Sequence, residues 1–257
     1  MVKNNLINIT RKVEVIMKKF ITVLLVAILS VGAMVVPSSA KTTSKVVNVS
    51  ALKKIEGACV EYGKEIYYVK TVDKKNSTTT TLYKCTKKGT NVTKLQSFSG
   101  SYTIGAIYNK KIYVSTGNET KGYKTFAISK LGKGKKTLVK TNLKVYSGSG
   151  KYMVGISSEP TDIGPKQLCV YNAQTNKKQS LGQGYSPVIV GKKVYYAVWD
   201  KQQKRYVVAH NVLGSTKRTV DARFPKSSNI YVKSVNEKRA VYYVQVKDTV
   251  KTKVLKY

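Results

Sequence analysis

The side chains that could carry nucleophilic or acid–base chemistry are few in this sequence. His210 is the only histidine, and it ends a run of apolar residues. A hydrolytic triad needs a histidine beside both a nucleophile and a carboxylate, and the residues around His210 offer no such pattern. We therefore expect His210 to be a solvated or hydrogen-bonded strand residue.

Paired carboxylates would indicate glycoside hydrolysis, which uses two acids on either side of the scissile bond. Glu61 lies in a strand-like run, Glu56 precedes the same run, and Asp221 falls in what looks like a later loop. No pair emerges from these positions. We predict no catalytic residues and expect Glu61 to be a solvated turn residue.

Metal and cofactor chemistry also lacks a signature. Cys59, Cys85 and Cys169 are the only cysteines, an odd number that implies no full disulfide framework. We expect each to be a small buried apolar residue, and one bridge between two of them stays open. The sequence has no CxxC or Cys/His cluster of the kind that binds zinc and no glycine-rich phosphate loop. We therefore predict no metal and no cofactor.

Charge is the most extreme property of the chain. The sequence has 47 lysines and arginines against 12 aspartates and glutamates, a formal net charge of +35. Such a surface attracts polyanions and repels cations. The bases are mostly lysines, which act as hydrated point charges rather than as the planar forks that recognise a specific phosphate. The pattern indicates diffuse, salt-sensitive attraction; the alternative is that lysines only coat exposed strand faces.

An internal repeat indicates the elements that carry these charges. A turn residue, one or two bases and an apolar run recur, and the copies align on Ile66, Ile112, Met153, Val194 and Val241, at spacings of 41 to 47 residues. Each copy has one short apolar run before it and one after it, and each of the first four copies has a further, weaker run after that. Runs rich in Val, Ile and Tyr between Gly, Asn and Lys turns are typical of strands. The second run is apolar almost throughout, which suits a strand packed on both faces.

Four strands in about 43 residues match one blade of a β-propeller. We predict an all-β fold over residues 41–257, a five-bladed β-propeller of four-stranded blades. The fifth unit lacks a fourth run, and residues 45–49 form an orphan run near the start. We expect this N-terminal strand to pair with the C-terminal unit and close the ring, which removes exposed sheet edges. The alternative is an open array of β-hairpin repeats.

The phrase Gly191-Lys192-Lys193-Val194-Tyr195-Tyr196 and its copies resemble those of exported TolB-like or lipoprotein-receptor-like β-propeller repeat proteins of clostridia and related Gram-positive bacteria. The resemblance covers residues 45–257. It implies an extracellular or wall-associated propeller, and it carries over no catalytic residues.

The N-terminal 40 residues have the layout of a secretory signal peptide. Lys18 and Lys19 precede an uncharged apolar run over residues 20–36, and Ser38 and Ala40 supply small residues before Lys41. We expect translation to start at Met17 and cleavage to follow Ala40, with a retained membrane anchor as the alternative. No other run is long enough to span a bilayer. We expect a secreted, extracellular protein, associated with the cell wall in one variant of this hypothesis.

Basic residues gather in the turns between the first and second strands and between the third and fourth strands of each unit. Antiparallel pairing would place these turns on one face of a disc. This turn-edge set comprises Lys64, Lys87, Lys88, Lys110, Lys111, Lys133, Lys135, Lys136, Lys151, Lys177, Lys178, Lys192, Lys193, Lys217, Arg218, Lys238 and Arg239. The opposite turns carry one acid per unit, at Asp73, Glu119, Glu159, Asp200 and Asp248, for which turn chemistry is the simpler explanation.

These patterns predict a monomeric, non-enzymatic binding protein whose turn-edge set engages a polyanion. The expected partners are anionic wall polymer, acidic polysaccharide or an envelope protein, with nucleic acid bound only non-specifically. One alternative is a carbohydrate-active propeller enzyme with an unrecognised channel site. A second alternative is an adhesin or matrix component.

Overall fold

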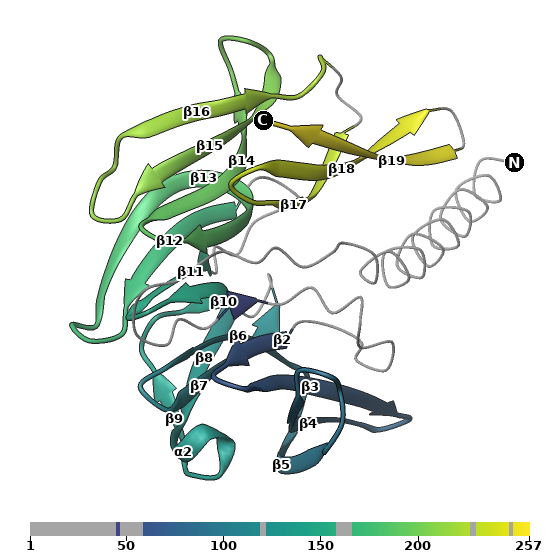
Figure 1. The fold of residues 1–257 in the computed structure, drawn as a ribbon, viewed down its shortest axis with the longest axis vertical. Helices are drawn as coiled ribbons and strands as arrows, with labels where there is room; N and C mark the ends of the chain where they lie inside the picture. The colour runs from purple at the N-terminus through teal and green to yellow at the C-terminus, as the bar shows by residue number, and fades with distance from the viewer. Residues whose placement is uncertain (1–44, 47–58, 119–121, 158–165, 227–229, 247–248) are drawn as a thin grey trace, which may run out of the picture.

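The computed structural model describes residues 45–46, 59–118, 122–157, 166–226, 230–246 and 249–257. The expected signal peptide, its start at Met17 and its cleavage after Ala40 lie outside these residues. The described chain is almost entirely antiparallel β-structure (Figure 1), as the sequence predicts. Within it, no helix has the length and apolar character needed to cross a membrane.

The strands group into five consecutive units of antiparallel sheet, in the order that the repeat predicts. The first unit comprises β2 (Cys59–Tyr62), β3 (Glu65–Lys74), β4 (Ser77–Thr86) and β5 (Thr93–Ser99). The second comprises β6 (Tyr102–Tyr108), β7 (Lys111–Asn118), β8 (Gly122–Ile128) and β9 (Lys136–Val139). A short turn, α2 (Ser129–Gly132), connects β8 to β9 and has left-handed backbone at Lys130 and Leu131.

The third unit comprises β10 (Leu143–Ser149), β11 (Tyr152–Ser157), β12 (Lys166–Asn172) and the first part of β13 (Lys177–Val190). The second part of β13 begins the fourth unit, which continues with β14 (Lys193–Asp200), β15 (Arg205–Val212) and β16 (Arg218–Arg223). The long β13 thereby joins two units into one seven-stranded sheet. The fifth unit comprises β17 (Ile230–Val235), β18 (Arg239–Val246) and β19 (Thr249–Lys256).

Most of the hydrophobic core lies between neighbouring units, and one smaller cluster lies within the first unit. On β14, Val194, Tyr196 and Val198 pack toward the third unit, while Tyr195 and Ala197 pack toward the fifth. Similar clusters join the first unit to the second and the second to the third. Because both faces of the second strand are buried, its residues are apolar without alternation, which confirms the interpretation of that run.

Tight backbone approach and buried hydroxyls also join the units. Gly105 on β6 lies so close to β10 that an added Cβ would stand 2.4 Å from the carbonyl oxygen of Val145, so only glycine fits there. The buried Thr125 hydroxyl donates to the Leu143 carbonyl at 2.5 Å. The Ser147 hydroxyl accepts from the Ile189 amide at 3.3 Å. These bonds satisfy polar groups that would otherwise be buried without a partner.

The expected pairing of the N-terminal strand with the C-terminal unit is not confirmed. The strand β1 (Lys45–Val46) pairs with β2, with Val46 opposite Val60, and also lies against β6 and β10. Residues 47–49 of the expected closing strand lie outside the described residues. Within the described part, β19 pairs only with β18. The five units follow an arc with the first and fifth at its two ends (Figure 1).

The three cysteines are buried thiols, as expected. Cys59 on β2 and Cys85 on β4 share one apolar cluster, but β3 lies between their strands. Two strand spacings separate their Cα atoms by about 9–10 Å, beyond the roughly 7 Å that a disulfide can bridge. Cys169 lies on β12, in another unit. The bridge that the sequence left open is absent.

Candidate functional site

The structure places the whole turn-edge set in the expected hairpins. Each member lies in a turn between the first and second or the third and fourth strands of its unit, or at the first two positions of the strand that follows. Because neighbouring strands are antiparallel, both kinds of turn lie at the same end of their sheet. In the first four units both turns carry bases, and in the fifth the turn between β17 and β18 carries Lys238 and Arg239.

Backbone hydrogen bonds bring the end of the third strand against the first turn in four units. In each of these units, the backbone N–H of a residue that follows the third strand donates a hydrogen bond to the carbonyl of a lysine in the first turn. The pairs are Leu131 to Lys110 at 2.9 Å, Ala173 to Lys151 at 2.8 Å, Leu213 to Lys192 at 2.8 Å, and Tyr257 to Lys238 at 3.0 Å. The repeated bond holds the chain that leaves the third strand against the first basic turn of its unit.

Most members of the turn-edge set are exposed, and Lys136, Lys151 and Arg239 are half-buried. The Lys87 ammonium forms an ion pair with Glu61. The Lys151 ammonium donates to the Gln174 side chain at 3.1 Å. Exposed lysines on short turns contribute mainly long-range attraction, since surface ion pairs are worth little.

Lys136 is the member whose position differs from the expectation. Its ammonium lies 4.8 Å from the ring centroid of Phe98 and 4.7 Å from those of Tyr102 and Phe126. It also donates to the Tyr102 hydroxyl at 2.9 Å. Three aromatic faces around one cation form a cation–π cage. Because Phe98 belongs to the first unit and Phe126 to the second, Lys136 joins two sheets, and its ammonium is engaged by the protein's own side chains.

Few acids accompany the bases at this edge. Glu65 accepts from the Lys84 ammonium and from the Tyr67 hydroxyl at 2.6 Å. These two hydrogen bonds lower the pKa of Glu65. The Glu65 carboxylate is therefore charged and is paired with groups of its own unit. At the opposite edge, Asp200 accepts from the amides of Gln202 and Gln203, both at 3.0 Å. That bonding is the turn chemistry expected of the acid.

Asp73 has a similar local role at that opposite edge, where it accepts from the Thr78 hydroxyl at 2.7 Å. Glu119, Glu159 and Asp248 lie outside the described residues.

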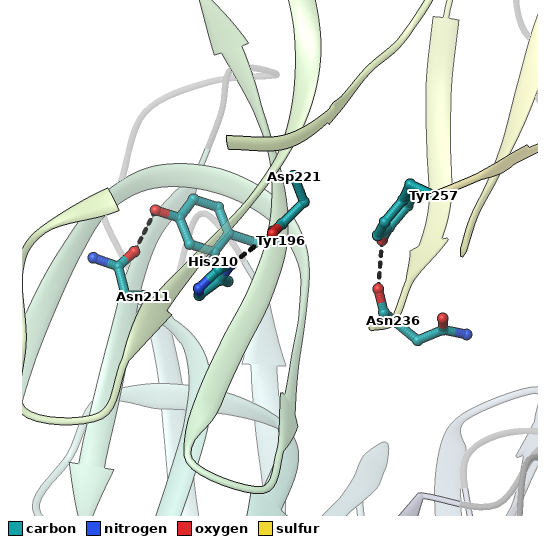
Figure 2. Close-up of polar contacts among 6 residues, drawn as sticks. All are labelled: Tyr196, His210, Asn211, Asp221, Asn236 and Tyr257. Carbon is teal, nitrogen blue, oxygen red and sulfur yellow. Dashed lines mark hydrogen bonds and ion pairs between the residues drawn. The ribbon is translucent and has the colours of Figure 1, made fainter. Parts of the chain in front are cut away.

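A histidine–carboxylate pair that sequence reasoning missed lies at the junction of the fourth and fifth units (Figure 2). His210 on β15 is 7% exposed, and its Nδ1 lies 2.8 Å from both carboxylate oxygens of Asp221 on β16. The β15–β16 register shifts so that Ala209 faces Val220 and Val208 faces Ala222, which leaves Asp221 as the extra residue of a β-bulge. A bulge re-aims a side chain, so the expected loop residue reaches the histidine.

Tyrosines surround this pair. The Tyr195 ring lies tilted by 41° against the His210 ring, with centroids 5.3 Å apart. Burial, and next the nearby Asp221 carboxylate, raise the pKa of both Tyr195 and Tyr257. The Tyr257 hydroxyl donates to the Asn236 carbonyl within the fifth unit (Figure 2). Among the described residues no hydroxyl or thiol is hydrogen bonded to His210, so the arrangement contains no triad.

No protein-family model matches the sequence, and no curated protein matches it. Among solved structures, TolB from Acinetobacter baumannii is 12% identical over 80% of this chain and 60% of that chain, with a TM-score of 0.45. The β-propeller domain of the Trilobed protease from Pyrococcus furiosus is 10% identical over 76% of this chain and 65% of that chain, with a TM-score of 0.45. A prolyl endopeptidase is 13% identical over 76% of this chain and 32% of that chain, with a TM-score of 0.51.

The chain thus spans less than two thirds of the length of each of these proteins. At such identities the likeness concerns the fold alone. The structural neighbours include TolB and a β-propeller domain, which is the kind of fold that the repeat predicts. Five blades in a closed ring remain a prediction.

Proposed function

We propose that this chain is an exported, non-enzymatic binding propeller whose turn-edge set, apart from Lys136, engages anionic polymers of the cell envelope or the extracellular space. We also propose that its five units are the blades of one propeller. The observation that carries the proposal is the common edge of the basic turns. Lysines at both turns of the first four units, with few acids beside them, create a positive edge that attracts a polyanion along its length.

The chemistry of lysine decides the kind of recognition. A lysine ammonium is a hydrated point charge on a flexible stem, so it contributes attraction without fixed geometry. The binding is therefore diffuse and depends steeply on salt, because screening acts over about 8 Å at physiological ionic strength. Lys136 takes no part in it, since its ammonium is held in the aromatic cage.

The carbohydrate-active alternative requires two converging acids on the innermost strands. Among the described innermost strands, which are β2, β6, β10, the second part of β13, and β17, Glu61 is the only acid. Glu61 is paired with Lys87. This arrangement favours binding over glycoside chemistry. The adhesin or matrix alternative shares the basic edge, and salt-dependent binding to heparin, wall polymer and DNA would separate it from binding to a specific protein partner.

Charge reversal at matched positions tests the proposal. The turn variant carries four substitutions of exposed lysines by glutamate, at Lys64, Lys88, Lys192 and Lys193. The control variant carries four such substitutions near the opposite turns, at Lys74, Lys75, Lys124 and Lys201. Both variants lose the same net charge, so they separate the edge from the overall charge.

We expect the full chain to be retained on immobilised polygalacturonate at low salt and released as salt rises. The turn variant elutes at much lower salt, and the control variant elutes near the wild type. If both variants elute together, net charge alone governs retention and the turn-edge set is not a binding surface. Retention that is unaffected by salt would contradict the electrostatic mechanism.

A further inference from the structure

A cleft of about 620 Å³ lies between the second and third units. Its walls come from β7, β8 and β9 on one side and from β12 and the turn after it on the other. The volume is in the range of sites that hold small organic ligands. The cleft shares Lys111 with the turn-edge set, and its other lining residues lie outside that set.

The charge at the cleft has one sign. Lys111 and Lys140 line it and are exposed. No carboxylate occurs among the described residues that line it. A concave site with two cations and no acid favours an anionic ligand.

Tyr113 is the feature that most directly indicates a ligand. Its side chain lines the cleft, the residue is only 4% exposed, and its hydroxyl has no hydrogen-bond partner among the described residues. The described buried polar atoms that lack a partner do not include this hydroxyl, so its oxygen is open to the cleft, where a ligand can accept its hydrogen bond. Burial, followed by nearby Tyr171 and Tyr108, raises the pKa of Tyr113 to about 12. At neutral pH the hydroxyl is therefore protonated and can donate.

Other donors lie beside Tyr113. The Tyr171 hydroxyl donates to Asn176 Oδ1 at 2.6 Å. Because the carboxamide oxygen is engaged in this way, the Asn176 nitrogen keeps two N–H donors. Leu138 lines the same cleft with 53% of its surface exposed. The site thus combines cations, neutral donors and an apolar side chain.

We propose that this cleft binds one carboxylated sugar residue of an acidic polysaccharide. The lysines face the carboxylate, Tyr113 and Asn176 donate to the ring oxygens and hydroxyls, and Leu138 packs against a C–H face. An isolated phosphate group would use neither Leu138 nor the volume. The inference rests on the proposed function in one respect, namely that the basic edge brings the polymer to the cleft.

Calorimetric titration of the full chain with digalacturonate measures binding at the cleft separately from binding of a long polymer along the turn edge. Tyr113→Phe removes only the hydroxyl, and Tyr68→Phe is its control, because Tyr68 is equally buried but lies in the first unit. Lys140→Met removes one cation of the cleft, and Lys94→Met is its exposed control on β5. The neutral dimethyl ester of the same sugar tests the need for the carboxylates.

We expect saturable binding at one site per chain. Tyr113→Phe and Lys140→Met each weaken it by roughly 3- to 10-fold, the scale of one lost hydrogen bond, while both controls bind as the wild type does. The dimethyl ester binds at least about fivefold more weakly, because charge-assisted bonds are about twice as strong as neutral ones.

Several results would overturn the cleft site: no saturable binding, equal binding by Tyr113→Phe, or equal binding of the ester. If polygalacturonate is still retained by the turn edge in that case, the proposed function stands and only the cleft fails. If digalacturonate binds but the turn variant and the control variant elute together, the cleft stands and the turn edge fails.

Discussion

Replacing Lys136 by methionine should destabilise the protein although no ion pair is broken. Methionine fills a similar volume, so the substitution removes the charge and the donor but keeps most of the packing. Lys136 is half-buried, and its ammonium lies 4.7–4.8 Å from three ring centroids. A partly desolvated cation–π contact contributes about 0.5–2 kcal/mol. A hydrogen bond from a charged donor, here to the Tyr102 hydroxyl, contributes about 1.5–3 kcal/mol.

These contributions overlap and are reduced by the cost of desolvating the ammonium, which methionine avoids. We expect a net loss of about 1–3 kcal/mol in the free energy of unfolding. For a domain of this size, the midpoint of thermal unfolding should fall by about 2–12 °C. Circular dichroism or calorimetry at one pH and one salt concentration measures the shift.

Lys135→Met is the matched control for Lys136→Met. Lys135 is the preceding residue and is exposed, so its replacement should change the free energy of unfolding by no more than about 0.5 kcal/mol. Equal midpoints for the two variants would refute the idea that the cage joins the first and second units. An increase in stability for Lys136→Met would show that the desolvation cost exceeds the cation–π gain.

Two further predictions concern buried polar groups. Asp221→Ala leaves the buried His210 without its carboxylate, so we expect a loss of about 1–3 kcal/mol, measured by denaturant unfolding at neutral pH; an unchanged midpoint would contradict a structural role for the pair. Burial raises the pKa of Tyr113 to about 12, while an unfolded tyrosine ionises near 10. This part of the stability is present below pH 10 and is lost as the pH rises toward 12. In an ultraviolet absorbance titration, Tyr113 should not ionise near pH 10 in the folded protein but should do so in the unfolded chain. Ionisation of every tyrosine near pH 10 in the folded protein would contradict the prediction.

The repeat predicts much of the fold because the same strand, the second, is buried in each unit. Ile66, Ile112, Met153, Val194 and Val241 all lie on the second strand of their units and are buried. Turn residues between the copies predict the hairpins, and therefore the edge on which the lysines lie. These features depend on neighbours along the chain, which a sequence pattern can express.

Contacts between units could not be predicted in the same way. The Lys136 cage needs Phe98 from the preceding sheet, and the His210–Asp221 pair depends on a bulge in β16. The pairing of β1 with β2 is a choice between possible partner strands that the repeat does not specify. A one-residue change of register reverses which side chains face a partner, and the sequence pattern alone does not specify that register.

The salt dependence of polyanion binding tests the central claim most directly. A random-sequence duplex DNA serves as a polyanion of known charge density, and anisotropy gives its affinity at several salt concentrations. The logarithm of affinity falls with the logarithm of salt by about 0.9 per neutralised phosphate. For the turn variant the slope should become shallower by up to about 3.6, one contact for each substituted lysine, while the control variant keeps the wild-type slope. Equal slopes for all three proteins would contradict a binding edge formed by the turn-edge set.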